Sequence, residues 1–107
     1  MIFGDGSQTR DYVYVGDVVA ANLAALEYRG SQPAFNVGTE TETNVVDLLA
    51  ACQAVAGTAV IPEHRPSRLG ELDRSCLDCS LAGAELGWRP SVGMTDGLRA
   101  TLASLHP

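Results

Sequence analysis

The strongest constraint on the fold lies near the start of the chain, in residues 2–17, IFGDGSQTRDYVYVGD. The Gly-Asp-Gly triplet at 4–6 supplies the positive φ angles of a tight turn. Residues 12–15 form a Tyr-Val-Tyr-Val run with strand preference. The segment therefore predicts a turn, then a strand with Arg10 at its beginning, then a helix whose N-terminus is favoured by the carboxylate of Asp17.

Apolar spacing and end signals predict the other helices and strands. The predicted helices cover residues 18–28, 45–56, a short stretch ending at 86, and 94–105, and short strands cover 34–38 and 60–61. Thr43 or Asn44 is expected to cap the second helix, and Gly57 and Gly87 provide left-handed stops. Trp88, directly after one of these stops, is predicted to fold back as a packing anchor.

Composition and charge exclude several classes of function. The chain has 107 residues, enough for one domain with a sizeable core. Its net charge of −6 argues against nucleic acid or an anionic membrane as a partner, because these bind broad basic surfaces. Its apolar runs are far shorter than the roughly 20 residues of a membrane-spanning helix. All seven basic residues are arginines, so a mechanism that needs a lysine is excluded.

The cysteines do not predict a disulfide framework or a metal centre. Their number is three, which is odd, and the sequence shows no signal peptide, so a cytoplasmic protein is expected. Cys76-x-x-Cys79 has the spacing of a zinc or redox pair, but zinc needs four ligands. Only Cys52, His64 and His106 remain to complete a set, at irregular spacing. We expect the spacing to be coincidental and no metal to bind.

Residues 62–75 are predicted to be a binding loop. They contain two prolines, three arginines and Gly70, without an apolar period. Binding residues lie disproportionately on loops of this kind. Within the loop, Arg65 and Arg74 are expected to be solvated surface charges.

Four segments carry a resemblance to a known family. They are GDGSQTRDYVYVGDV, FNVGTETETNVVDLL, SRLGELDRS and DCSLAGAELGWRP. In this order and spacing they resemble the C-terminal portion of NAD-dependent epimerases/dehydratases, the extended short-chain dehydrogenases/reductases, and most of all the UDP-glucose 4-epimerase branch. The similarity extends from Ile2 to about Leu102. Two departures are Gly16, where the family usually has Asp, and Glu40, where it usually has Gly.

The resemblance implies a partial α/β domain covering residues 1–107. It would be a small mixed unit with about four helices and a few short strands, corresponding to about the last third of a longer enzyme. The Rossmann N-terminal part is absent, because the sequence has neither a glycine-rich dinucleotide fingerprint nor the catalytic Tyr-x-x-x-Lys pair. We therefore expect no catalytic residue and no cofactor bound by this chain alone, and NAD as the cofactor of the parent enzyme.

The resemblance also implies four substrate-binding residues. Arg10 and Arg68 match family arginines that reach the diphosphate of a nucleotide sugar, and Glu71 matches an acidic residue near the ribose hydroxyls. Guanidinium groups suit this role because they stay charged and donate bidentate hydrogen bonds to phosphate. Asn36 matches an asparagine at a strand end, where we expect backbone fixing more than ligand contact.

Plainer interpretations exist for three of these side chains. Arg10 can pair in solvent with Asp11 or Asp5, and Arg68 with Glu71, as exposed ion pairs of little energetic weight.

The function expected from the resemblance is binding of the diphosphate portion of a UDP-sugar for an NAD-dependent epimerase or dehydratase. The alternative is a non-catalytic module for interaction or oligomerisation. In the full enzyme, residues 18–28 and 34–37 would pack on the absent sheet, so their apolar faces are expected to be uncovered here and to favour a homo-oligomer.

Overall fold

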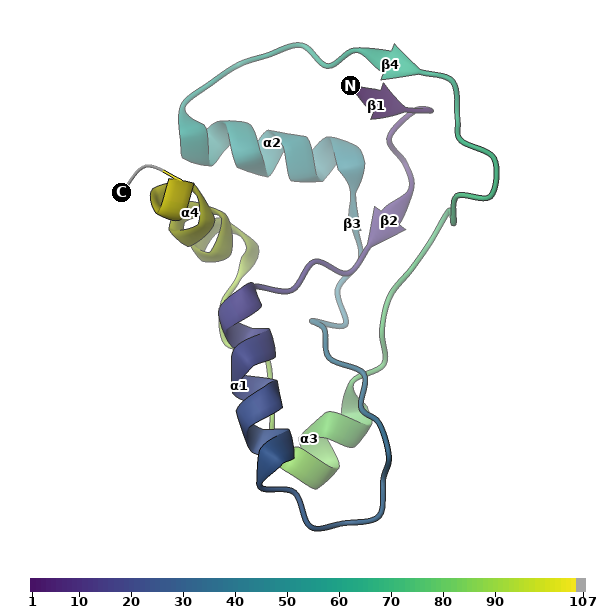
Figure 1. Cartoon of the computed structure of the whole chain (residues 1–107). Helices are drawn as coiled ribbons and strands as arrows, with labels where there is room; N and C mark the ends of the chain where they lie inside the picture. The colour runs from purple at the N-terminus through teal and green to yellow at the C-terminus, as the bar shows by residue number, and fades with distance from the viewer. Residues whose placement is uncertain (106–107) are drawn as a thin grey trace.

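The computed structural model describes residues 1–105, which contain four helices and four two-residue strands joined by turns and loops (Figure 1). In chain order they are β1 (Ile2–Phe3), β2 (Thr9–Arg10), α1 (Val15–Leu26), β3 (Thr43–Asn44), α2 (Val45–Ala56), β4 (His64–Arg65), α3 (Ser80–Leu86) and α4 (Met94–Leu105). Helix α2 packs against α4, and α1 packs against α3. The predicted small mixed α/β fold is confirmed.

The predicted glycine turn forms and leads into both strand pairs. Gly4 and Gly6 have φ angles of 73° and 80°. Strand β1 pairs in parallel with β4, and β2 pairs antiparallel with β3, with Arg10 opposite Thr43. The predicted strand at 12–15 is wrong: β2 ends at Arg10, and α1 begins at Val15 instead of at residue 18. β3 pairs only with Thr9 and Arg10, so the strand preference of the residues that follow has no partner backbone to satisfy it.

The strands predicted at 34–38 and 60–61 are also absent from the described part of the chain, and a strand forms at 64–65 instead. A strand needs a neighbouring strand for its hydrogen bonds. Phe35 and Val37 nevertheless lie half-buried against the core, so the expectation that this apolar segment is uncovered is wrong for these two side chains.

Helix α2 begins and ends at the residues that the sequence predicts. The Asn44 side chain accepts a hydrogen bond of 2.7 Å from the Asp47 amide, and the Gly6 carbonyl accepts one of 3.0 Å from the Val45 amide. Gly57 ends the helix with a φ of 72°. The apolar stripe of α2 is only half-buried, because α4 covers part of it.

The core is small and lies between α1 and α3. Its buried members are Ala21, Cys79, Ala82 and Trp88. The radius of gyration is 16.2 Å, compared with about 13 Å for a compact chain of this length. The length allows a sizeable core, but the buried cluster in the described residues is small, whereas the prediction that Trp88 is a packing anchor is confirmed.

Asp17 connects α1 to the segment before α4. Its carboxylate is 4% exposed and accepts hydrogen bonds from the Ser91 amide, the Ser91 hydroxyl and the Val92 amide at 2.9 to 3.1 Å. Its carbonyl accepts a 2.9 Å bond from the Trp88 indole. Burial by itself raises the pKa of Asp17, but the bonds from Val92 and Ser91 outweigh it and lower the pKa below its usual value. Asp17 thus stabilises a long-range contact as well as lying in the first turn of α1.

One side of α1 is exposed although it is apolar. Val15, Val19, Leu23 and Leu26, here called the apolar α1 face, recur at helical spacing and are each at least 50% exposed. The expectation that this helix has an uncovered apolar side is confirmed. No helix within residues 1–105 combines the length and the apolar character needed to cross a membrane.

Replacing Asp17 with Ala is expected to lower the free energy of unfolding by about 2 to 4 kcal/mol, because the Ser91 and Val92 amides lose a charged acceptor. Urea denaturation measures the change. Glu27→Ala is the matched control at the exposed end of α1 and should change the free energy by less than about 0.5 kcal/mol. Equal effects of the two substitutions would contradict the role given to Asp17.

Candidate functional site

Arg10 lies at the end of β2 with its guanidinium held by two backbone carbonyls. Nη1 donates to the carbonyls of Thr9, at 2.6 Å, and Leu72, at 2.8 Å, while Nη2 lies 3.6 Å from the Glu71 carboxylate. The Arg10 and Glu71 side chains are 30% and 29% exposed. The interpretation of Arg10 as paired with Asp11 or Asp5 is wrong, because its acidic neighbour is Glu71.

The predicted binding loop is tied to β2 by backbone hydrogen bonds. The Thr9 amide donates to the Asp73 carbonyl at 2.9 Å, and the Ser75 amide donates to the Thr9 carbonyl at 3.1 Å. At the other end of the loop, the Gly4 amide donates to the Arg65 carbonyl at 2.6 Å. The loop is therefore attached at both ends to the segment that carries Arg10.

Arg68 lies over the aromatic ring of Phe3. Its guanidinium carbon is 3.7 Å from the ring centroid, a distance at which a cation is attracted to the ring face. The Gln8 amide links this contact to Glu71, since Nε2 donates to the Phe3 carbonyl at 3.0 Å and to the Glu71 carboxylate at 3.5 Å. We call Arg10, Arg68 and Glu71, with Phe3 and Gln8, the arginine cluster. The interpretation of Arg68 and Glu71 as an ion pair with each other is wrong.

Asn36 does not join the arginine cluster. Its Nδ2 donates a hydrogen bond of 3.4 Å to the carbonyl of Asp78, just before α3. This contact joins two backbone segments, which is the kind of role expected for Asn36 from the sequence.

Asp11 is a structural residue that the sequence did not single out. Its carboxylate accepts hydrogen bonds from the Thr39 amide, the Thr39 hydroxyl and the Glu40 amide. Burial raises the pKa of Asp11, but these bonds together lower it below its usual value. A Cβ at Gly38 would lie 2.6 Å from Asp11 Oδ2, so the close approach requires glycine. Glu40 has a φ of 61°, in the left-handed region that glycine adopts most readily, and glycine is the residue that the family resemblance led us to expect there.

Glu42 fastens the loop to β2 by side-chain contacts. It accepts two hydrogen bonds from Arg74, at 2.8 and 2.7 Å, and one from the Thr9 hydroxyl at 2.8 Å. The bonds from Arg74 and Thr9 lower the pKa of Glu42 to about 2. Arg74 is 78% exposed and is therefore a surface charge, as expected, but its guanidinium is also engaged in this bidentate pair.

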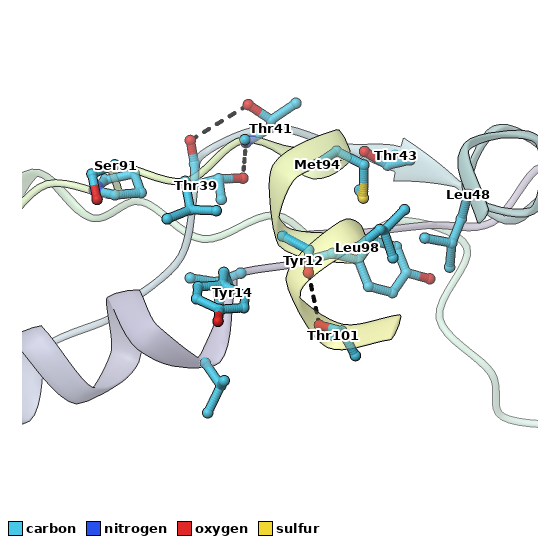
Figure 2. Close-up of a pocket in the computed structure, with 16 residues that line it drawn as sticks. Tyr12, Tyr14, Thr39, Thr41, Thr43, Leu48, Ser91, Met94, Leu98 and Thr101 are labelled. Carbon is cyan, nitrogen blue, oxygen red and sulfur yellow. Dashed lines mark hydrogen bonds between the residues drawn. The ribbon is translucent and has the colours of Figure 1, made fainter. Parts of the chain in front are cut away.

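The larger apolar cavity has none of the residues of the arginine cluster in its lining. Its volume is about 610 Å³, and it is bounded by α4, the start of α2 and the segments 12–15 and 39–43 (Figure 2). Leu48, Met94 and Leu98 point into it beside Tyr12 and Tyr14. Among the described residues its lining contains no Asp, Glu, Arg or His. The cavity therefore lacks the charge needed to bind a diphosphate, which the arginine cluster has.

The cysteine pair has no features of a reactive or metal-binding site. Cys79 is buried and Cys76 exposed, and desolvation together with the Asp11 carboxylate raises the pKa of both thiols. In the part of the chain that the structure describes, no three metal-binding side chains are grouped closely enough to hold an ion. His106, considered above as a ligand, lies outside the described residues.

Comparison with known proteins identifies the family to which the chain belongs. A family described as GDP-mannose 4,6 dehydratase matches residues 1–101. The chain belongs to this family of NAD-dependent epimerases/dehydratases, the extended short-chain dehydrogenases/reductases. The resemblance carried by the four sequence motifs is thus confirmed.

Several of the similar proteins are sugar-nucleotide epimerases. The chain is 46% identical over 101 residues to the UDP-glucose 4-epimerase of Mycolicibacterium smegmatis, covering 94% of this chain and 32% of that protein. It superimposes with a TM-score of 0.92 and 42% identity on UDP-glucose 4-epimerase of Thermotoga maritima with UDP-glucose, covering 98% of this chain and 34% of that one. UDP-glucuronic acid 4-epimerase of Bacillus cereus, in complex with UDP-glucuronic acid and NAD, gives a TM-score of 0.89 at 30% identity, with the same coverage. The chain spans about a third of the length of these relatives.

Glu42 is expected to remain ionised at low pH, with a titration midpoint near 2. Because its pKa is lower in the folded chain than its usual 4.5, the stability contributed by the Glu42–Arg74 pair is present above about pH 4.5 and is lost as the pH falls through 2. Carboxyl carbon chemical shifts in an NMR titration measure this midpoint. Arg74→Gln should move the midpoint upward, whereas Arg99→Gln on α4 should leave it in place, and equal midpoints in all three proteins would contradict the assignment.

Proposed function

We propose that the chain binds the diphosphate of a UDP-sugar through Arg10 and Arg68, as the substrate-binding part of an NAD-dependent sugar epimerase or dehydratase. The observation that carries this proposal is the arginine cluster, in which Arg10 contacts Glu71, and Gln8 connects Glu71 to Phe3, whose ring lies under Arg68. Relatives with bound UDP-glucose and UDP-glucuronic acid support the same ligand class.

The electrostatics favour a local anion site on an acidic chain. The net charge is −6, so a diphosphate gains nothing from the overall charge of the molecule and needs positive groups within hydrogen-bond reach. The carbonyls of Thr9 and Leu72 hold one amine of the Arg10 guanidinium, which orients the group before any ligand arrives. A planar, oriented guanidinium is suited to the bidentate recognition of phosphate oxygens.

The remaining candidate residues receive positioning or ribose roles in this proposal. Glu71 would accept hydrogen bonds from the ribose hydroxyls, because a carboxylate is an acceptor at neutral pH. Asn36 would act through the backbone, by holding its segment against the carbonyl of Asp78. Hydride transfer to NAD would belong to the rest of the enzyme, since that chemistry needs a base held by a lysine, which this chain does not contain.

Replacing Arg10 or Arg68 with Ala is expected to weaken UDP-glucose and UDP binding by about 2 to 5 kcal/mol, because each substitution removes a charged donor from the diphosphate. Isothermal titration calorimetry at low salt measures the binding, with NAD as a ligand that this chain should ignore. Arg99→Ala is the matched control, since Arg99 pairs with Asp96 on α4 and carries the same charge.

Binding by both variants at the wild-type affinity would refute the diphosphate site. The absence of any heat with UDP or UDP-glucose at millimolar concentration, from a chain shown to be folded by circular dichroism, would refute binding by this chain itself.

The apolar α1 face favours a second role, self-association through homo-oligomers. Four large aliphatic side chains on one side of a helix form a continuous surface that water solvates poorly. A second copy of the chain presents the same surface, so two such faces can cover each other about a twofold axis.

Sedimentation velocity over a range of concentrations tests this second role, with dimers expected to increase with concentration. Leu23→Gln should shift the equilibrium toward monomer by about fivefold or more, because it places an amide in the centre of the apolar surface. Ile61→Gln replaces another exposed aliphatic residue outside α1 and should have little effect. A monomer at every concentration, or equal effects of both variants, would refute association through α1.

A further inference from the structure

The Arg10 guanidinium already has an anionic neighbour within the chain. Glu71 approaches Nη2 to 3.6 Å, and Gln8 donates to the same carboxylate oxygen at 3.5 Å. Any phosphate that binds Arg10 in a bidentate manner must displace this carboxylate or accept a negative charge about 4 Å away, and like charges at that distance repel. Glu71 is therefore placed to influence which anions bind.

We propose that Glu71 determines selectivity at this site by competing with the ligand phosphate for Arg10, so that the site favours diphosphates carrying a ribose over inorganic pyrophosphate. The inference rests on the proposed function and extends it. A nucleoside diphosphate carries ribose hydroxyl groups that can donate hydrogen bonds to the displaced carboxylate. Inorganic pyrophosphate brings none, so Glu71 remains a negative charge without a cationic partner beside a polyanion.

The strength of the Arg10–Glu71 contact suits such an exchange. Both side chains are about 30% exposed, and ion pairs of this exposure contribute little and are readily replaced. The second Arg10 amine stays on the Thr9 and Leu72 carbonyls, so the guanidinium keeps its position when its carboxylate neighbour leaves.

The backbone next to Glu71 allows the carboxylate to move. Gly70 has a φ of 79°, and nothing lies within 4 Å of the position that its Cβ would occupy. The neighbouring Leu69 is fully exposed, with a relative accessibility of 104%. On the other side, the Asp73 carbonyl is fixed to β2 by the Thr9 amide. The loop is thus held at Asp73 and unhindered at Gly70, which allows Glu71 to turn without a rearrangement of β2.

The experiment compares Glu71→Gln with Asp73→Asn in the 107-residue chain, with inorganic pyrophosphate and UDP as the two probes. Both substitutions remove one negative charge from the same loop, but only Glu71 contacts Arg10. Calorimetry at low ionic strength gives the two dissociation constants and their ratio for each protein, and low salt is needed because screening weakens exposed charge interactions.

The expected result is that Glu71→Gln tightens pyrophosphate binding by about two- to fivefold, the range that an exposed ion pair allows. UDP binding should gain less or weaken, so the preference for UDP over pyrophosphate falls by at least about twofold. Asp73→Asn should leave that preference unchanged.

Three outcomes would overturn the inference: an unchanged preference in Glu71→Gln, an equal change in Asp73→Asn, or failure of Glu71→Gln to bind pyrophosphate while UDP binds. In each of these three outcomes, the proposed function is still supported if Arg10→Ala loses UDP binding. If no variant binds UDP or pyrophosphate, both the inference and the proposed function are wrong, and the two failures are thereby distinguished.

Discussion

The structure depends on carboxylates that accept hydrogen bonds from segments far away in the sequence. Asp17 holds residues 91 and 92, Asp11 holds residues 39 and 40, and Glu42 holds Arg74 and Thr9. The buried cluster between α1 and α3 has only four members, so these contacts also contribute to fixing how the helices and loops are arranged. In all three carboxylates hydrogen bonding lowers the pKa, which indicates that the ionised form is the one that stabilises the chain.

These contacts also organise the candidate site. The Thr9 backbone exchanges hydrogen bonds with the loop, and its side chain donates to Glu42, so one residue joins β2 to the loop in two ways. Arg10 follows Thr9 directly in the chain, so the same contacts fix the position of its backbone. The larger cavity, by contrast, is formed by helices and connectors that carry apolar side chains and hydroxyls, and none of the residues of the arginine cluster lines it.

The helices were predictable because their signals are local. The apolar period together with Asn44 and Gly57 specifies α2, and Gly87 with Trp88 specifies the end of α3. The strands expected at 12–15 and 34–38 were predicted wrongly, because strand formation depends on a partner backbone that no local pattern reveals.

The candidate site could likewise be predicted from the sequence only in part. The sequence motifs indicated Arg10, Arg68 and Glu71, which the fold brings into one cluster. Asp11 and the Glu42–Arg74 pair were missed, since each joins residues about thirty positions apart and any of several acidic side chains could have taken the same partners. The choice among them is made by the turn geometry at Gly38 and by the pairing of β2 with β3.

The dimensions of the molecule, 49 × 37 × 17 Å, have a consequence for its architecture. The two longer dimensions are each more than twice the shortest one, so the molecule is flat. Stable domains are ordinarily built from two or three layers around a shared interior. A flat molecule has a large surface for its volume, and a further layer packed on the apolar α1 face would bury that part of the surface.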